Sequence, residues 1–137
     1  MTRNNVMRGT ADKFPDDLVD SLVTALLAVN NYSLEKVWKV LPRLQDEGLT
    51  KPGPVASEDL TRLTTRLAEA GYDRGRLTAM FAERLQNLMA AIVSGQLDDL
   101  RSAATRKDLQ ALQRTLCRVR GVGPQVAQNA WILLQEE

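Results

Sequence analysis

The stretch that most constrains this chain is residues 109–134, which reads as two helices joined by Gly121-Val122-Gly123-Pro124. Apolar residues on both sides of the turn recur at spacings of three and four, the period of one helix face. Glycines permit positive φ and close approach of the backbone to a partner, and a proline suits the first turn of a helix. We therefore expect a helix–turn–helix hairpin. The apolar positions are Leu109, Leu112, Leu116, Val119, Val126, Ala127, Ala130 and Leu134.

The turn of this hairpin predicts an anion site. The amides around Val122 and Gly123 would lie at a helix start, where unpaired N–H groups and the helix dipole favour a phosphate. Arg114, Arg118 and Arg120 approach the same turn. Such a combination is typical of binding to a nucleic-acid backbone. The alternative is an ordinary turn between helices that needs two glycines.

Composition narrows the choice of chemistry. The net charge is only +1, so a nucleic-acid surface must be a local patch, and 4% aromatic residues argue against a base-stacking platform. The absence of histidine excludes Ser-His-Asp and Cys-His catalysis and His-ligated zinc. The single cysteine, Cys117, excludes a disulfide framework or an iron–sulfur cluster within one chain. We expect Cys117 to be a small buried residue.

The chain shows no signature of a membrane protein. No segment has the roughly 20 consecutive apolar residues that a membrane helix requires. The polar N-terminus lacks the apolar centre of a signal peptide. We expect a cytoplasmic protein.

Helical periodicity without any strand pattern predicts an all-α fold, a barrel-like bundle of six to seven helices. Residues 1–13 are expected to form a flexible arm and residues 14–137 a single helical domain. Residues 46–56 are expected to be a loop, and a short helix is expected over residues 97–104. Expected helix boundaries are a start at Phe14-Pro15, caps at Ser33, Ser57, Asp73 and Thr105 with Asp108 in capping-box position, an end or kink at Pro42, and an end at Ser94-Gly95.

The segment VRGVGPQVAQNA resembles the helix-hairpin-helix of the endonuclease III and 8-oxoguanine glycosylase superfamily, whose signature is Leu-Pro-Gly-Val-Gly-x-Lys-x-Ala. Arg120 replaces the usual proline, and Gln125 occupies the position of the catalytic lysine. The resemblance spans roughly residues 14–135, but only the hairpin is specific. The matching positions are Gly121, Val122, Gly123 and Ala127.

This resemblance implies a barrel that binds duplex DNA, including damaged DNA. Hairpin amides would hold a phosphate, aided by a monovalent cation (K+ or Na+). The carbonyls of Cys117, Val119 and Val122 would bind that cation, and no iron–sulfur cluster is expected. The family's second domain is missing, so self-association or a partner subunit is expected to cover the open cleft.

Two further segments resemble the family. Residues 26–30 occupy the place of a turn whose polar residue fills the gap left by a flipped base, a role that Asn30, or alternatively Asn31 or Tyr32, could take. The other reading is that the two asparagines merely form a turn. Residues 71–77 resemble a second turn, so Arg74 and Arg76 are expected to line a groove, unless they are solvated charges at a helix start.

Catalysis is not expected, because Gln125 has no nucleophilic nitrogen and the family's aspartate would fall beyond Glu137. The expected function is therefore non-catalytic DNA binding through Arg118, Arg120, the hairpin, Asn30, Arg74 and Arg76. One alternative is an active DNA glycosylase or AP lyase of base excision repair. Another is a protein-interaction domain derived from the same fold. The candidate carboxylates for an enzyme are Asp98, Asp99 and Asp108; Glu136 and Glu137 fall too early.

Overall fold

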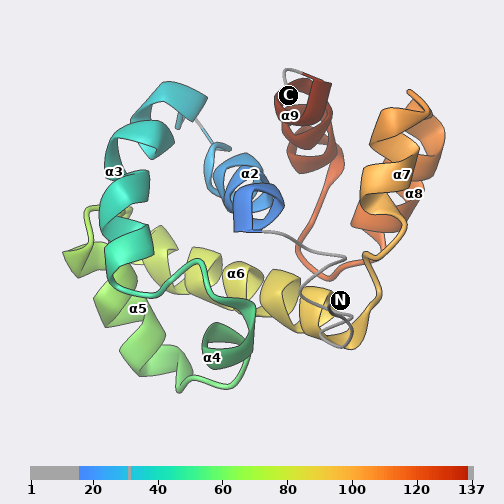
Figure 1. The fold of residues 1–137 in the computed structure, drawn as a ribbon. Coiled ribbons are helices and arrows are strands. Elements are labelled where there is room, and N and C mark those ends of the chain that lie inside the picture. Colours follow the sequence, from blue (N-terminus) through green and yellow to red (C-terminus); the bar gives the residue numbers. More distant parts are fainter. Residues whose placement is uncertain (1–15, 31, 136–137) are drawn as a thin grey trace, which may run out of the picture.

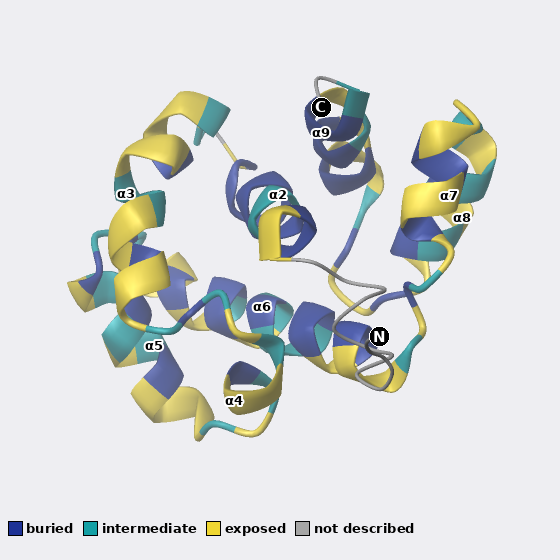
Figure 2. Ribbon diagram, viewed as in Figure 1, coloured by how far each residue is buried: buried dark blue, intermediate teal, exposed yellow. Residues whose placement is uncertain are grey.

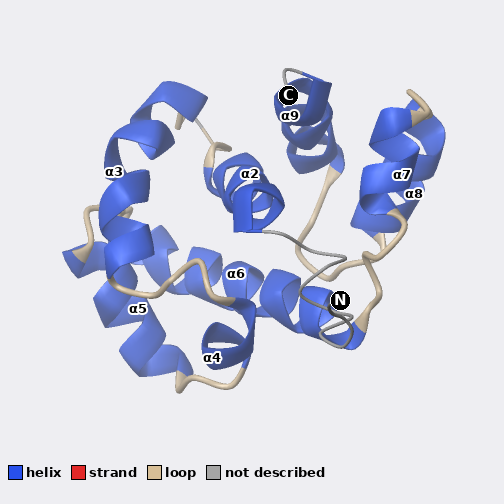
Figure 3. Cartoon of the chain, viewed as in Figure 1, coloured by secondary structure: helices blue, strands red, loops and turns tan. Residues whose placement is uncertain are grey.

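The computed structural model describes residues 16–30 and 32–135, and within them all regular structure is helical (Figure 1, Figure 3). The predicted all-α class is confirmed. The expected arm and the residues Phe14, Pro15, Asn31, Glu136 and Glu137 lie outside the described part. The elements are α2 (Asp16–Leu27), α3 (Leu34–Asp46), α4 (Pro52–Ala56), α5 (Leu60–Glu69), the 3-10 helix η1 (Gly75–Leu77), α6 (Thr78–Ser94), α7 (Leu100–Thr105), α8 (Leu109–Cys117) and α9 (Pro124–Gln135).

Helix α2 lies at the centre of the bundle, where it packs against α3, α6 and α9 (Figure 1). Figure 2 shows it buried along most of its length. Its sequence is apolar almost all round, as expected for a helix with several neighbours. The one buried hydroxyl, Thr24 Oγ1, donates to the Asp20 carbonyl at 2.8 Å, so its burial leaves no unsatisfied donor. The C-terminal end of α2 leads directly into Asn30.

Helix α6 forms the base on which two smaller helices pack. Both α4 and α5 contact it, and α7, α8 and α9 pack against one another beside it (Figure 1). Helix α6 ends at Gly95 as predicted, with φ of +85°, a left-handed cap that glycine adopts readily. The hairpin is also present as predicted, because α8 ends at Cys117 and Pro124 is the first residue of α9.

The predicted loop over residues 46–56 is wrong, because it contains the short helix α4. Pro52 occupies the first position of α4, and Val55 is fully buried against the core. Ser57 follows α4 and does not cap the next helix. Asp59 caps α5 instead, since its carboxylate accepts the Arg62 amide at 3.0 Å.

Other predicted boundaries are wrong in similar ways. Thr105 ends α7, and Asp108 caps α8 by accepting the Ala111 amide at 3.1 Å. Asp73 accepts the Gly75 amide at 2.9 Å and so heads η1 instead of α6. In each case a carboxylate accepts a hydrogen bond from an amide near the predicted position. The three-dimensional arrangement decides which amide that is.

Pro42 does not end α3, which continues to Asp46 because Leu44 beyond the proline is fully buried.

Cys117 is exposed, contrary to expectation. The neighbouring Leu116 takes the core position of α8, and one residue is a rotation of about 100° around a helix.

No helix in the described ranges is long and apolar enough to cross a membrane. The cellular compartment stays a prediction.

Candidate functional site

The two glycines of the hairpin have different surroundings. Gly121 has φ of +89°, and a Cβ there would lie 2.7 Å from Arg84 Cγ. Gly123 has no positive φ, and a Cβ there would meet no atom within 4 Å. The fold therefore requires glycine at 121, whereas the surface at Gly123 is simply left open.

Backbone bonding determines which amides the turn offers. The Val122 amide donates to the Val119 carbonyl at 3.1 Å, so it is already used within the hairpin. The Gly123 carbonyl accepts the Ala127 amide at 3.1 Å and starts the hydrogen bonding of α9. The first-turn amides of Gln125 and Val126 precede any acceptor within α9. These amides, and not that of Val122, form the positive end of the helix dipole.

A hollow of about 370 Å³ opens beside this turn, and we refer to it as the hairpin hollow. Three elements meet there: the end of α2, helix α6 and the hairpin. The structure thus brings Asn30 together with Gly121, Val122, Gly123 and Gln125, as the sequence suggested for one site. The complete lining is Val29, Asn30, Arg84 and residues 121–126.

A second hollow of about 400 Å³ adjoins the first, and we refer to it as the α3 hollow. It shares Val29, Asn30 and Gln125 with the hairpin hollow. No acidic side chain is among the described residues that line either hollow. The lining of the α3 hollow is Ala28, Val29, Asn30, Tyr32, Ser33, Lys36 and Gln125.

Arg74 holds the turn at Asn30 in place. Asn30 has φ of +58°, a left-handed conformation that asparagine tolerates better than most residues. The Arg74 guanidinium donates to the Val29 carbonyl at 3.2 Å and to the Asn30 carbonyl at 2.7 Å. Arg74 is half-buried and lines neither hollow, so it positions Asn30 without being part of the lining.

Aromatic rings surround the Arg74 guanidinium. Its Cζ lies 4.7 Å from the ring centroid of Tyr32 and 4.9 Å from that of Phe81. The Tyr72 hydroxyl accepts from Arg74 at 2.8 Å and donates to the Leu27 carbonyl at 2.6 Å. Burial raises the pKa of Tyr72 to about 12, despite the opposing hydrogen bond from Arg74. The hydrogen bonds tie the end of α2 to Tyr72 and Arg74, and the ring contact with Phe81 connects the cluster to α6.

Gln125, at the position of the family's lysine, is linked to α2 through Asn129. The Asn129 amide nitrogen donates to the carbonyls of Ala25 at 3.2 Å and Ala28 at 3.0 Å. Its oxygen therefore faces Gln125, whose side-chain nitrogen donates to it at 3.1 Å. Asn129 is buried, so these bonds fix the hairpin against the turn that carries Asn30.

The predicted arginines of the hairpin lie on its exposed side. Arg114, Arg118 and Arg120 are exposed. The backbone beside them is anchored to α6, because the Asn87 side chain donates to the Arg120 carbonyl at 3.4 Å. Arg76 is exposed in η1 and lines neither hollow. The positive side chains of the hairpin are therefore available to solvent.

The remaining predicted site residues are the carbonyls expected to bind a cation and the carboxylates considered for an enzyme. Among the carbonyls expected to bind a cation, that of Val119 already accepts the Val122 amide, which leaves one lone pair for an ion. In the part of the chain that the structure describes, no three acidic, cysteine or histidine side chains are grouped as metal ligands. Asp98, Asp99 and Asp108 line neither hollow.

Sequence reasoning missed Arg84 and Asn129. Asn129 interrupts the apolar face formed by Val126, Ala130 and Leu133, and a polar residue at such a position signals a buried hydrogen bond. Arg84 carried no comparable signal, because its role depends on the packing of α6 against Gly121.

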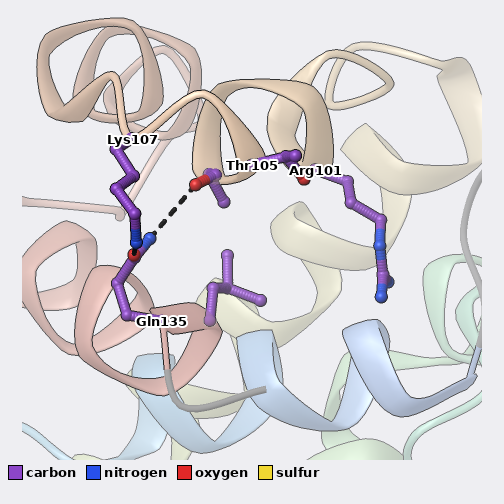
Figure 4. Close-up of a pocket in the computed structure, with 6 residues that line it drawn as sticks. Arg101, Thr105, Lys107 and Gln135 are labelled. Carbon is purple, nitrogen blue, oxygen red and sulfur yellow. Dashed lines mark hydrogen bonds between the residues drawn. The ribbon is translucent and has the colours of Figure 1, made fainter.

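A separate hollow of about 230 Å³ lies between α7 and the end of α9 (Figure 4). Lys107 donates to the Gln135 side chain at 2.8 Å, and Gln135 donates to the Ala104 carbonyl at 3.2 Å. These bonds cross the hollow at the C-terminal end of α9, away from the turn of the hairpin.

No protein-family model, curated protein or solved structure matches this chain. The likeness to the glycosylase superfamily therefore stays a prediction based on the hairpin residues.

Proposed function

We propose that this protein binds duplex DNA by its phosphate backbone through the hairpin, without the family's catalytic chemistry. The observation that carries the proposal is the hairpin hollow, where first-turn amides of α9, Arg84 and Asn30 meet. Amides at a helix start and a guanidinium together favour a phosphate over other ligands.

The exposed arginines extend this surface beyond the hollow. Arg118 and Arg120 lie just before the turn and supply charge that attracts the backbone without reading sequence. A net charge of +1 requires such local concentration, because the molecule as a whole has no strong positive field. A monovalent cation on the turn carbonyls of Cys117, Val119 and Val122 is part of the same proposal and would add charge opposite the phosphate.

We exclude the family's lysine chemistry because Gln125 occupies the position of the lysine. An amide nitrogen is not nucleophilic, and this one donates to the Asn129 side chain at 3.1 Å. Gln125 therefore serves the structure of the hairpin, and its position beside the hollow makes it a contact for the bound strand.

The test is a binding titration at two salt concentrations. The probes are a duplex with an abasic-site analogue and its undamaged twin, with strand cleavage assayed on gels from the same tubes. We expect binding that weakens steeply with salt and no cleavage, and tighter binding to the abasic duplex would indicate damage recognition. Cleavage would contradict the non-catalytic part, and absence of binding at low salt would turn the search towards a protein partner.

Charge-matched variants make the titration specific to the hairpin. Arg118→Gln and Arg120→Gln should each lower the slope of log affinity against log salt by about 0.9 for each lost phosphate contact. Arg62→Gln is the control, because its side chain is 76% exposed on α5 and pairs only weakly with Glu58. Equal slopes in all three variants would show that the hairpin is not the contact surface.

A further inference from the structure

We propose that the hairpin hollow and the α3 hollow form one track for consecutive phosphates of a single nucleic-acid strand, with Arg84 and Lys36 as phosphate contacts at its two ends. This inference rests on the proposed function, because it extends the hairpin site. It assigns phosphate binding to two residues, and to helix α3, that the hairpin motif does not contain.

Continuity of the two hollows is the first argument. They share Val29, Asn30 and Gln125, so a ligand that leaves the hairpin along this side reaches α3 without crossing another element. Their volumes are similar, at about 370 and 400 Å³. A repeating polymer fills two similar adjoining sites, whereas a small ligand would fill one.

Charge is the second argument. Each hollow has one cationic side chain in its lining, Arg84 in the first and Lys36 in the second. Between them lie the carboxamides of Asn30 and Gln125, which can donate or accept hydrogen bonds without charge. With no carboxylate among the described lining residues, the track suits a ligand that is negative at intervals.

Arg84 is held at its end of the track by contacts, among the described residues, with a glycine and an aromatic ring. Its stem lies where a Cβ of residue 121 would be, and its Cζ is 5.5 Å from the Phe81 ring centroid. The ion pairs seen at Arg62, Arg66 and Arg106 do not include Arg84. The face of an aromatic ring attracts the guanidinium but does not accept hydrogen bonds from the N–H groups at its edge. Those five N–H groups lie in the guanidinium plane, where a phosphate can bind them.

Lys36 is placed at the other end in a comparable way. Its Nζ lies 5.4 Å from the ring centroid of Tyr32, and its backbone amide donates to Ser33 Oγ at 3.1 Å. The Tyr32 ring in turn meets the Tyr72 ring edge-on at 4.9 Å between centroids. The ammonium group is therefore held near the α3 hollow by a ring that is itself anchored in the fold.

Hydrogen bonds hold the backbone of the turn that the two hollows share. Arg74 bonds the carbonyls of Val29 and Asn30 from below, and Asn129 bonds those of Ala25 and Ala28. These four bonds hold the end of α2 and the turn at Asn30, which the two hollows share. A turn that is held in this way binds a strand with a smaller loss of conformational entropy.

The experiment uses the full chain and fluorescently labelled single-stranded oligothymidylates of increasing length. Arg84→Gln should weaken binding at every length, because it acts beside the hairpin. Lys36→Gln should weaken binding only of oligonucleotides long enough to reach from the hairpin to α3. For long probes each variant should lower the salt slope by about 0.7, the single-strand value for one phosphate.

Matched controls separate these effects from loss of fold or charge. Lys39→Gln removes the same charge from the same helix, but its side chain lines neither hollow. Arg84→Lys keeps the charge and should restore most of the binding. Unchanged thermal unfolding of each variant confirms that the fold is intact.

Several results would overturn the track. One is salt-dependent binding by the wild type that Lys36→Gln leaves unchanged at every probe length while Arg84→Gln and Arg118→Gln weaken it; this would leave the hairpin proposal standing. A second is equal competition by poly-glutamate of the same charge, which would indicate an acidic protein segment as the occupant. No binding of either duplex or single strand by the wild type would remove the proposed function together with the track.

Discussion

Tyr72 shows how much one side chain organises around the site. Its hydroxyl donates to the Leu27 carbonyl and accepts from Arg74, while its ring meets those of Tyr32 and Phe81 edge-on. Arg74 connects these groups to the turn that carries Asn30, because it donates to the carbonyls of Val29 and Asn30. A buried phenol that donates to a carbonyl must stay protonated for the arrangement to hold, because a phenolate would face that carbonyl without a proton.

Titration should reveal this environment directly. Burial raises the pKa of Tyr72 to about 12, above the ordinary value of 10.0. Between those values the unfolded chain releases a proton that the folded chain retains, so the stabilising contribution is complete below pH 10 and is lost as the pH rises towards 12. Tyrosinate absorbance followed against pH should show a late phase that Tyr72→Phe removes. A wild-type curve with no late phase would contradict the buried hydrogen bond.

At the scale of elements, the helices that the sequence predicted well are those whose ends carry local signals. Gly95 ends α6 and Pro124 begins α9, and both act through their own backbone preferences. Helix α8 is a contrasting case, because two candidate caps precede it. Asp108 binds the Ala111 amide, while Thr105 belongs to the helix before.

Replacing each candidate in turn should therefore show whether Asp108 or Thr105 caps α8. Asp108→Ala should lower the free energy of unfolding by about 1 kcal/mol, since the Ala111 amide loses its acceptor. Thr105→Ala should change it by less than about 0.5 kcal/mol. Asp108→Asn keeps an acceptor and controls for the exposed pair with Arg106, whose nitrogen lies 3.9 Å away. Denaturant unfolding of the three variants measures the difference, and equal losses for Thr105→Ala and Asp108→Ala would contradict the assignment.

What the sequence could not predict depends on contacts between distant residues. Helix α4 forms in a Pro- and Gly-rich stretch because Val55 reaches the core, which no local pattern indicates. Arg74 bonds carbonyls 44 and 45 positions away. Asn129 bonds carbonyls 101 and 104 positions away. The hairpin was predictable from its own sequence pattern, and the family resemblance suggested that Asn30 belongs to the same site, but the residues that hold them together were not predictable.

At the scale of the whole molecule, Asn129 joins the C-terminal helices to the central one. Helix α9 packs along α2, and the Asn129 side chain closes this contact at the end that faces the site. The expected covering of an open cleft by a second copy or a partner subunit stays a prediction. Exposed large apolar side chains are spread over α3, α5, η1, α6 and α9 and do not by themselves define an interface: Trp38, Leu60, Leu77, Val93 and Ile132.

Asn129→Ala should affect both stability and binding. The carbonyls of Ala25 and Ala28 would lose a buried donor, which should lower the free energy of unfolding by about 1–3 kcal/mol. Gln125 would lose its acceptor and should move, so affinity for duplex DNA should fall. The slope of log affinity against log salt should stay unchanged, because no charge is lost. Gln128→Ala, on the exposed side of the same helix, is the control. Wild-type stability in Asn129→Ala would show that the bonds to α2 are not significant.

The exposed position of Cys117 gives this protein a built-in point of chemical attachment. The chain has no other cysteine, and this thiol lies at the last residue of α8, beside the turn. A DNA-cleaving reagent tethered there would act on bound nucleic acid without any engineered residue. The cuts would report which end of the strand, 5′ or 3′, leaves the hairpin towards α3, and would thereby give the polarity of the bound strand.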